Sequence, residues 1–259
     1  MLLPRPVGPV SEAVVSLLRT GRANSAWSEA DALGEMDVLH DHDAQLALAT
    51  CYELHYGGFS DVDDRLEWSP DVSAVVTALE AALEDALRTI EPAVRVDGSD
   101  VTAALRQLVD EDDGPSLASY VLRTADLEQA RDVIVQKSLY QLKEADPHTW
   151  ALPRLTGRAK AAMVEIQSDE YGGGRVDAMH SELFRRTMRA LGLDDSYGAY
   201  LDQALPETLA AVNTVTMFGL HRRLRGAVVG HLAALEMTST QPSRRYANGL
   251  RRLGFGPEA

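Results

Sequence analysis

The sequence has 259 residues, of which 45% are hydrophobic and only 6% aromatic, and its formal net charge is −14. A chain this acidic repels phosphate backbones, and no run approaches the roughly 18 apolar residues of a membrane span, so we expect neither nucleic acid nor a membrane as partner. The single cysteine, Cys51, excludes an intramolecular disulfide and suits the reducing cytoplasm, where we expect the protein to be located.

Abundant Ala and Leu with few aromatic residues favour packed helices, and we expect an all-α fold. Residues 1–10 are expected to form an extended arm, followed by a short helix with Ser11 as its N-cap. A longer helix is expected over residues 29–56. The next is expected to begin at the Trp68–Asp71 segment and to end near Ile90, because a proline follows at position 92.

In the second half of the chain, residues 124–126 are expected to cap a helix that carries Glu144 and ends before Pro147. A turn is predicted over residues 146–150. Pro206 is expected to open a later helix, and the last helix is predicted over residues 243–254.

Two histidine-containing segments of the helix expected over residues 29–56 could suggest metal, but their spacing is against it. His40 and His42 flank Asp41, and residues two apart on a helix point away from each other, so we expect a solvated face there. Glu53 and His55 have the same spacing, and for them a role in the wall of a pocket stays open. Asp61–Asp64 is read as a solvated turn rather than a calcium loop.

Three ionisable residues are predicted to share apolar helical stripes, where an unpaired charge is costly. They are Glu144, Glu170 and His180. Each has apolar neighbours at helical spacing, for example Ile166 and Met163 for Glu170. Carboxylates and an imidazole facing one core are the donors of a carboxylate-rich iron site.

The spacing of two of these residues predicts a break in the helix. Glu170 and His180 are ten residues apart, which is roughly 15 Å of rise on one continuous helix. Gly172, Gly173 and Gly174 lie between them, and glycine tolerates a bulge or bend. We therefore predict a broken or bulged helix with both side chains turned to one cavity.

The segments Lys143–His148, Glu165–Gln167 and Asp169–Gly174, with His180 following, resemble the haem-oxygenase-like diiron oxidases, often described as iron-containing redox enzymes. The resemblance extends from about Leu127 onward. It implies a haem-oxygenase-like helical bundle over residues 126–259. Residues 1–125 would then form an N-terminal helical extension packed on this core.

The resemblance also implies a ligand set. In the family, a Glu, then a Glu and a His, and then a labile Glu on a later helix bind two irons. The matching positions are Glu144, Glu170, His180 and Glu236. The family's final helix supplies a His-x3-Asp-x2-His pattern that does not occur in this sequence and would begin shortly after Ala259. The site as written therefore lacks the final ligand helix.

By the same resemblance, the cofactor is a pair of irons that change between Fe(II) and Fe(III), and O2 is the co-substrate. The expected partners are a small-molecule substrate and an external electron donor, and a homodimer is also expected. Our first hypothesis is N-oxygenation of an amine or an amino-acid-derived substrate in specialised metabolism. The alternatives are a diiron enzyme that cleaves or desaturates an amino or fatty acid, and a non-catalytic helical binding protein with an incomplete site.

Each proposed ligand also has a purely structural interpretation. Glu144 could be an exposed residue at a helix end, and Glu170 a surface acid beside the glycines. His180 could be a hydrogen-bonded core histidine, and Glu236 could pair with an arginine. A haem-degrading enzyme is a weaker alternative, because no histidine near the N-terminus has the neighbours that a proximal haem ligand needs.

Overall fold

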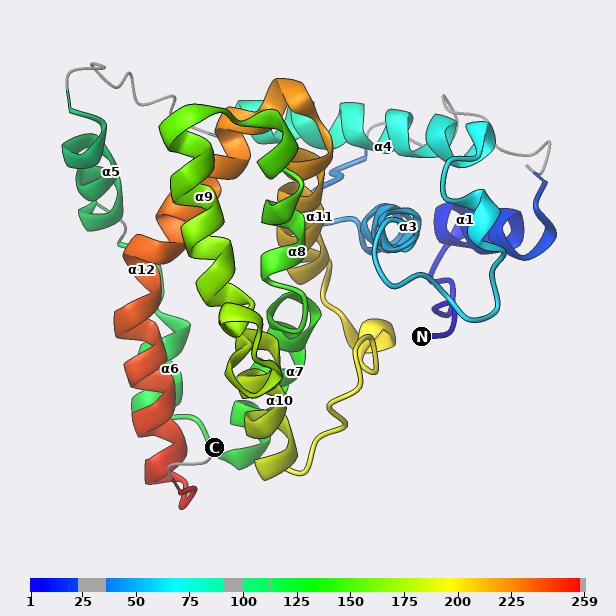
Figure 1. Ribbon diagram of the computed structural model, residues 1–259. Coiled ribbons are helices and arrows are strands. Elements are labelled where there is room, and N and C mark those ends of the chain that lie inside the picture. Colours follow the sequence, from blue (N-terminus) through cyan, green and yellow to red (C-terminus); the bar gives the residue numbers. More distant parts are fainter. Residues whose placement is uncertain (23–35, 91–99, 112, 257–259) are drawn as a thin grey trace. The chain divides into compact units, whose positions relative to one another are not determined.

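The computed structural model describes residues 1–22, 36–90, 100–111 and 113–256. Within these residues it contains helices and no strand, which confirms the predicted all-α fold (Figure 1). None of the helices in the described residues is long and apolar enough to cross a membrane.

The chain divides into two compact units. Unit 1 comprises Met1–Glu91 and Ser196–Met217, and unit 2 comprises Pro92–Asp195 and Phe218–Ala259. Helix α11 (Pro206–Leu220) begins in unit 1, and its last residues belong to unit 2. The predicted division at residue 125 stays a prediction.

Unit 1 is built around three helices that contact one another: α1 (Pro9–Thr20), α3 (His42–Glu53) and α4 (Pro70–Thr89). Two short 3-10 turns, η1 (Asp64–Leu66) and η5 (Leu201–Gln203), and the first part of α11 also belong to it. The contacts bury apolar side chains from all three helices, and this burial stabilises the unit. They include Val14, Leu18, Leu46, Leu48, Val75, Leu79 and Leu83.

The start of α1 differs from the prediction. Gly8, not Ser11, is the N-cap, and Pro9 occupies the first helical position. The Ser11 hydroxyl donates to Asp43 Oδ1 at 2.5 Å, and Asp43 Oδ2 accepts from the Val10 amide at 2.7 Å. Asp43, which follows the His40–His42 segment predicted as a solvated face, therefore satisfies amides in the first turn of α1 instead.

Helix α3 is shorter than the helix predicted over residues 29–56, of which 29–35 lie outside the described residues. It begins at His42 because the Asp41 side chain accepts from the Ala44 amide at 2.8 Å. It ends at Glu53, whose buried carboxylate accepts from the Tyr197 hydroxyl at 2.6 Å and from the Gly57 amide at 3.1 Å. Glu53 therefore serves the packing of unit 1.

The polar residues of α11 in unit 1 connect it to other parts of that unit. Asn213 Nδ2 donates to the backbone oxygen of Gln45 at 2.9 Å and to its side-chain Oε1 at 2.7 Å. The Tyr56 hydroxyl donates to Thr216 Oγ1 at 3.2 Å. Asn213 and Thr216 are both buried, and these bonds offset the cost of burying polar groups.

Unit 2 contains the helices that carry the predicted ligands. The long helix α12 lies beside α6 and also contacts α5 and α8, while α7 contacts α10 and α8 contacts α9 (Figure 1). The α-helices are α5 (Val101–Asp110), α6 (Leu117–Arg123), α7 (Leu127–Gln141), α8 (Ala145–Thr149), α9 (Gly157–Glu170), α10 (His180–Ala190) and α12 (Arg225–Arg252). The 3-10 turns are η2 (Leu152–Arg154), η3 (Gly172–Gly174), η4 (Val176–Ala178) and η6 (Arg222–Leu224).

Two predicted elements of unit 2 are corrected by the structure. Residues 146–150 were predicted as a turn, but most of them form α8, because proline is tolerated in a first helical turn. The helix predicted over residues 243–254 is the second half of α12, which passes through Pro242 without ending. Burial of Gly249 and Leu250 in the packing of α12 against α6 holds this half in place.

Candidate metal centre

Glu144 lies in the connection between two helices. Helix α7 ends at Gln141, so Glu144 is not on it as predicted, but is the N-cap residue of α8 with helical backbone angles. Its part-buried carboxylate accepts from Gln141 Nε2 at 2.9 Å through Oε2. The short turn between α7 and α8 therefore fixes where this carboxylate lies.

Glu170 is the last residue of α9, and the three glycines follow it as predicted. The helix does not continue to His180: η3 and η4 intervene, and α10 begins at His180. The break predicted at the glycines is therefore confirmed.

The turn after Glu170 depends on Gly172, which has φ +65° and is buried. A Cβ atom at this position would lie 2.6 Å from both the Ala178 carbonyl carbon and the Met179 nitrogen. Only glycine permits this approach without strain. The chain thereby folds back on itself and returns His180 to the end of α9.

Glu170 and His180 form an ion pair, with His180 Nδ1 2.8 Å from Glu170 Oε2. The Glu170 side chain is 10% exposed and that of His180 48% exposed, so the pair is open to solvent on the histidine side. Together with Glu144, these residues each offer one ligand atom, and the three atoms lie within 4.8 Å of one another. The structure thus brings together three of the four predicted residues.

A small pocket of about 80 Å³ adjoins the three side chains. Its lining residues come from the turn before α8, the end of α9 and the start of α10. They are Leu142, Lys143, Glu144, Ala145, Asp146, Glu170, Tyr171, Met179, His180 and Ser181.

Burial and mutual repulsion perturb the ionisable groups at this site. Burial raises the pKa of Glu144 from 4.5 to about 7, and the negative charge of Glu170 adds to the shift. The pKa of His180 is raised, chiefly because its ring is hydrogen-bonded to Glu170. Two carboxylates held this close favour a cation between them, so the donor set of two carboxylates and an imidazole fits a metal ion such as iron.

Glu236, the fourth predicted residue, is not among the three grouped side chains. It is on α12 and is exposed, whereas the ligand role implied by the resemblance requires a side chain turned toward the other three residues. Among the described residues, the group of three ligand atoms does not extend to it. Burial of the Glu236 carboxylate raises its pKa, and the negative charge of Glu170 adds to the shift. Glu236 therefore interacts electrostatically with the site.

A hydrogen-bond network behind the site was not foreseen from the sequence. The Tyr171 hydroxyl donates to Asp146 Oδ1 at 2.7 Å and lies 2.9 Å from Thr149 Oγ1. Gln167 Nε2 donates to the Ala145 carbonyl at 2.7 Å and to Thr149 Oγ1 at 2.6 Å. These bonds tie α8 to α9 and so fix Glu144 relative to Glu170. The polar Gln167 on the apolar face of α9 was the available signal.

A buried histidine pair also lies in this unit. His148 is fully buried, and its Nδ1 lies 3.1 Å from the Glu144 carbonyl oxygen, which can only accept. Nδ1 therefore carries the proton, and Nε2 accepts from His231 Nδ1 at 3.1 Å. Burial lowers the pKa of His148 to about 4, and the ring serves as a neutral hydrogen-bonding group.

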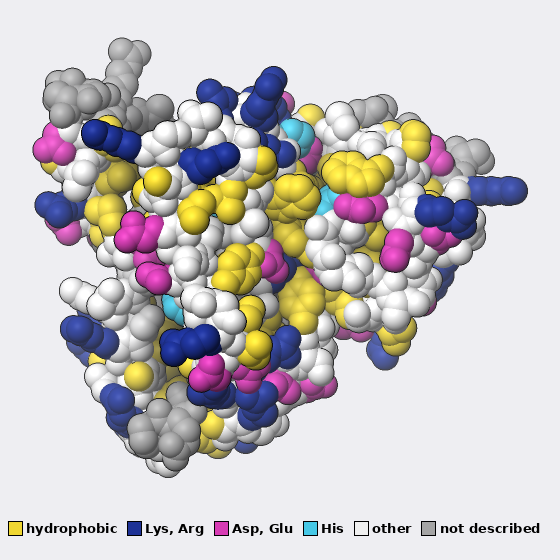
Figure 2. Space-filling view, in the orientation of Figure 1, with side chains coloured by type: hydrophobic (Ala, Val, Ile, Leu, Met, Phe, Trp, Pro, Cys, Tyr) yellow, Lys and Arg dark blue, Asp and Glu magenta, His cyan; other side chains and the backbone are white. Residues whose placement is uncertain are grey.

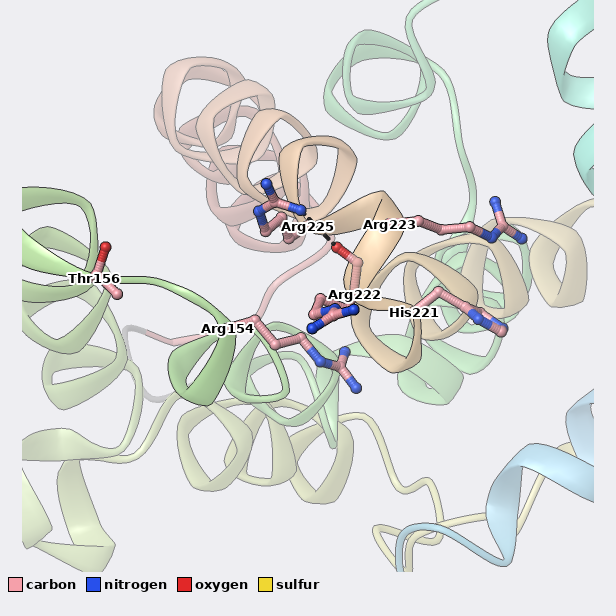
Figure 3. A pocket seen from close by; sticks show the side chains of 6 residues that line it. All are labelled: Arg154, Thr156, His221, Arg222, Arg223 and Arg225. Atoms are coloured by element: carbon pink, nitrogen blue, oxygen red, sulfur yellow. Dashed lines mark hydrogen bonds between the residues drawn. The ribbon is translucent and has the colours of Figure 1, made fainter.

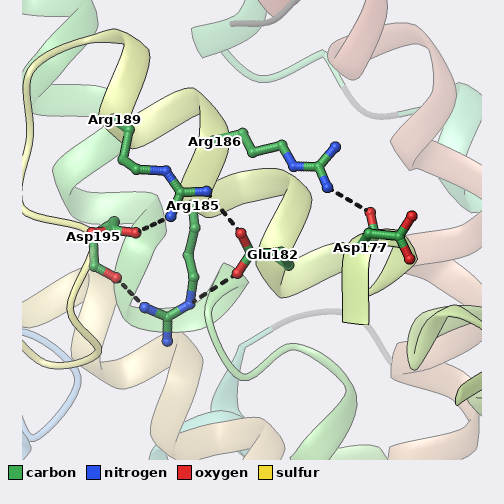
Figure 4. A network of polar contacts seen from close by, with 6 residues as sticks. All are labelled: Asp177, Glu182, Arg185, Arg186, Arg189 and Asp195. Carbon is green, nitrogen blue, oxygen red and sulfur yellow. Dashed lines mark hydrogen bonds and ion pairs between the residues drawn. The ribbon is translucent and has the colours of Figure 1, made fainter. Parts of the chain in front are cut away.

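An ion network on α10 holds the helix that begins at His180 (Figure 4). Arg189 contacts Glu182 Oε1 at 2.7 Å and Asp195 Oδ2 at 2.6 Å. Arg185 donates to the Asp195 carbonyl, and Arg186 Nη2 donates to the Asp177 carbonyl at 2.9 Å. Each exposed ion pair contributes little to stability alone, but together these contacts stabilise the position of α10 relative to the segments on both sides of it.

Comparison with known proteins gives this geometry its context. A family model described as iron-containing redox enzyme matches residues 131–259, which include all four predicted ligand positions. The chain belongs to this family. The family membership confirms the resemblance on which the haem-oxygenase-like fold was predicted.

A curated relative in this context is the nitrosourea synthase of Streptomyces achromogenes subsp. streptozoticus. It is 30% identical to this chain over 202 residues, which is 75% of this chain and 43% of the relative. The chain thus spans less than half the length of that protein. The present chain is a member of the iron-containing redox enzymes, and it carries a donor set suited to iron in Glu144, Glu170 and His180.

Proposed function

We propose that this protein is a non-haem diiron oxidoreductase that uses O2 to oxygenate the nitrogen of an amine or an amino-acid-derived substrate. The observation that supports this most directly is the convergence of ligand atoms from Glu144, Glu170 and His180. Membership of the iron-containing redox enzymes supports iron as the metal. The nitrosourea synthase relative supports chemistry at nitrogen, because a nitrosourea carries an oxidised nitrogen.

The residues would act by charge and by position. Glu144 and Glu170 supply negative charge, His180 supplies a neutral donor, and Glu236 is the proposed further carboxylate. Iron bound there would supply the redox chemistry that activates O2. Three donors suffice for one ion, and the second ion of a diiron site would require additional ligands, of which Glu236 is our candidate.

The pocket beside the site sets how a substrate would approach. Its volume of about 80 Å³ accommodates only the reacting end of a molecule. Since the His180 side chain is half exposed and that of Glu170 is not, the substrate would enter from the histidine side. The Ser181 side chain is the polar group of this lining that would orient an amine, because the Tyr171 hydroxyl is already bonded to Asp146 and Thr149.

Iron binding is the first test. The protein would be titrated with Fe(II) without oxygen, desalted, and its iron content measured beside Glu144→Ala, Glu170→Ala and His180→Ala. We expect the wild type to retain iron and each variant to lose most of it with helicity unchanged. Glu165→Ala is the matched control, because Glu165 is an exposed carboxylate on the same helix as Glu170. Equal iron in all five proteins would refute the site.

The reaction type needs a second measurement. The iron-loaded protein would be supplied with a reductant, an amine and ¹⁸O2, and the product mass determined. Label on nitrogen supports the proposal. An alkene or a lost carbon fragment supports the cleaving or desaturating alternative. Intact iron without any O2-dependent product supports a binding protein with an incomplete site.

A further inference from the structure

A second pocket in unit 2 is lined almost entirely by basic residues (Figure 3). It has a volume of about 760 Å³. No acidic side chain is among the described residues that line it, which are Arg154, Thr156, His221, Arg222, Arg223 and Arg225. Four arginines line this open cavity and give it a strong positive potential.

This positive potential is local, because the chain as a whole carries a net charge of −14. The two segments that form the pocket contain no Asp or Glu: none occurs over residues 147–164 or over residues 208–235. Figure 2 shows Lys and Arg side chains gathered over the end of unit 2 where α9 and α12 begin. The basic residues are therefore concentrated, not evenly mixed with acids.

The guanidinium group of Arg154 has a hydrogen-bond donor that the described residues leave without an acceptor. Its Nη2 donates to the Leu220 carbonyl at 2.7 Å, but its Nη1 is buried and has no hydrogen-bond partner among the described residues. Burial, and then the charge of Arg222, lower the pKa of Arg154. Figure 3 shows the guanidinium groups of these two arginines next to each other. A buried donor beside a like charge is costly unless an anion accompanies it.

Two helices also begin at this pocket. Thr156 is the N-cap of α9 and Arg225 is the first residue of α12, and neither helix has a side-chain hydrogen bond at its N-cap. The Arg225 amide already donates to the Arg222 carbonyl in η6, so α9 is the helix whose first amides are open to a ligand. The amides of a first helical turn have no intrahelical acceptor, and the helix dipole places partial positive charge there. Both features favour an oxyanion.

We propose that this pocket binds the phosphate group of a small molecule. A phosphate dianion matches the paired charges of Arg154 and Arg222, accepts the hydrogen bonds of Arg154 Nη1, and offers the arginines more charge and more acceptor oxygens than a single carboxylate does. The site is separate from the metal centre. Helix α9 begins at this pocket and ends at Glu170, so its 14 residues put roughly 20 Å between them.

Calorimetric titration with inorganic phosphate, at low ionic strength and without metal, tests the proposal. We expect binding to the wild-type chain that is about tenfold or more weaker in Arg154→Gln and in Arg222→Gln, as loss of a charge-assisted bond predicts. Arg222→Gln keeps the test decisive if Arg154→Gln folds poorly, because the Arg222 side chain is exposed. Arg106→Gln, an exposed arginine on α5, is the control for charge alone. Acetate in place of phosphate should bind at least tenfold more weakly.

Two results would overturn the proposal. One is the absence of phosphate binding to the wild type, and the other is equal binding by wild type, Arg154→Gln and Arg222→Gln. Equal affinity for acetate would overturn the assignment to phosphate. Because the titration is done without metal, its outcome is independent of iron loading, and failure of either site can be recognised separately.

Discussion

His180 Nδ1 lies 2.8 Å from Glu170 Oε2, although the two residues are ten positions apart in the chain. On one continuous helix they would be separated by roughly 15 Å of rise. The turn through η3 and η4 removes that separation, and it exists because Gly172 can take φ +65° against the backbone of Ala178. The donor set is therefore a consequence of one local turn.

Substituting Gly172 should disrupt the donor set. In Gly172→Ala the new Cβ would meet backbone atoms at 2.6 Å, in a backbone conformation unfavourable for alanine. We expect a loss of about 1–3 kcal/mol in the free energy of unfolding, together with loss of most of the bound iron, because His180 is displaced from Glu170. Urea unfolding and iron content measure the two effects.

Gly173→Ala is the matched control for that prediction. Gly173 also has positive φ, at +61°, but a Cβ there would meet nothing within 4 Å. The control should lose only about 1 kcal/mol from the backbone conformation and should keep its iron. If the two variants bind iron equally well, the turn does not position the site.

The metal-free protein should lose stability as the pH rises from the ordinary pKa of Glu144, 4.5, through its raised value of about 7. Glu144 has a folded-state pKa of about 7 against an ordinary 4.5, so the folded state binds more protons over this interval and stability falls with increasing pH. His180 has a raised pKa, and its stabilising contribution is likewise lost as the pH rises. Glu144→Gln should therefore stabilise the metal-free protein at pH 8 by about 1–2 kcal/mol and much less at pH 5. Chemical unfolding at both pH values measures this, and Glu165→Gln should show neither change.

Iron should reverse this pH dependence. At low pH, protons compete with the metal for Glu144 and His180, whose raised pKa values make both easy to protonate. Fe(II) added without oxygen should therefore raise the melting temperature at pH 8 and have little effect at pH 5.5. An equal increase at both pH values would mean that the metal binds to other groups.

Part of this structure could be predicted from the sequence because local signals determine it. Pro70 and Pro206 open their helices as predicted, and Asp126 caps α7 with a reciprocal bond to Gln129. The helix break between Glu170 and His180 followed from spacing and glycines alone. Each of these depends on residues within a few positions of one another.

The remainder depends on contacts between distant segments. His148 and His231 are 83 positions apart, and no local pattern pairs them. Helix α12 continues through Pro242 because tertiary packing outweighs the missing amide donor. The basic pocket joins Arg154 to arginines about 70 positions later, and no local pattern brings these two segments together.

A close backbone approach in unit 2 provides the last prediction. Gly219, near the end of α11, packs against α8, where an added Cβ would lie 2.3 Å from the Pro147 carbonyl oxygen. Gly219→Ala should therefore cost about 1–3 kcal/mol in the free energy of unfolding, and it should weaken iron binding because Glu144 is the N-cap of α8.

Gly230→Ala should have the opposite effect on the free energy of unfolding. Gly230 lies inside α12, its added Cβ would meet nothing within 4 Å, and alanine in a helix interior is favoured by about 0.5–1 kcal/mol over glycine. Urea unfolding of the two variants should shift in opposite directions, and a Gly219→Ala protein as stable as the wild type would show that α8 is free to move without loss of the fold.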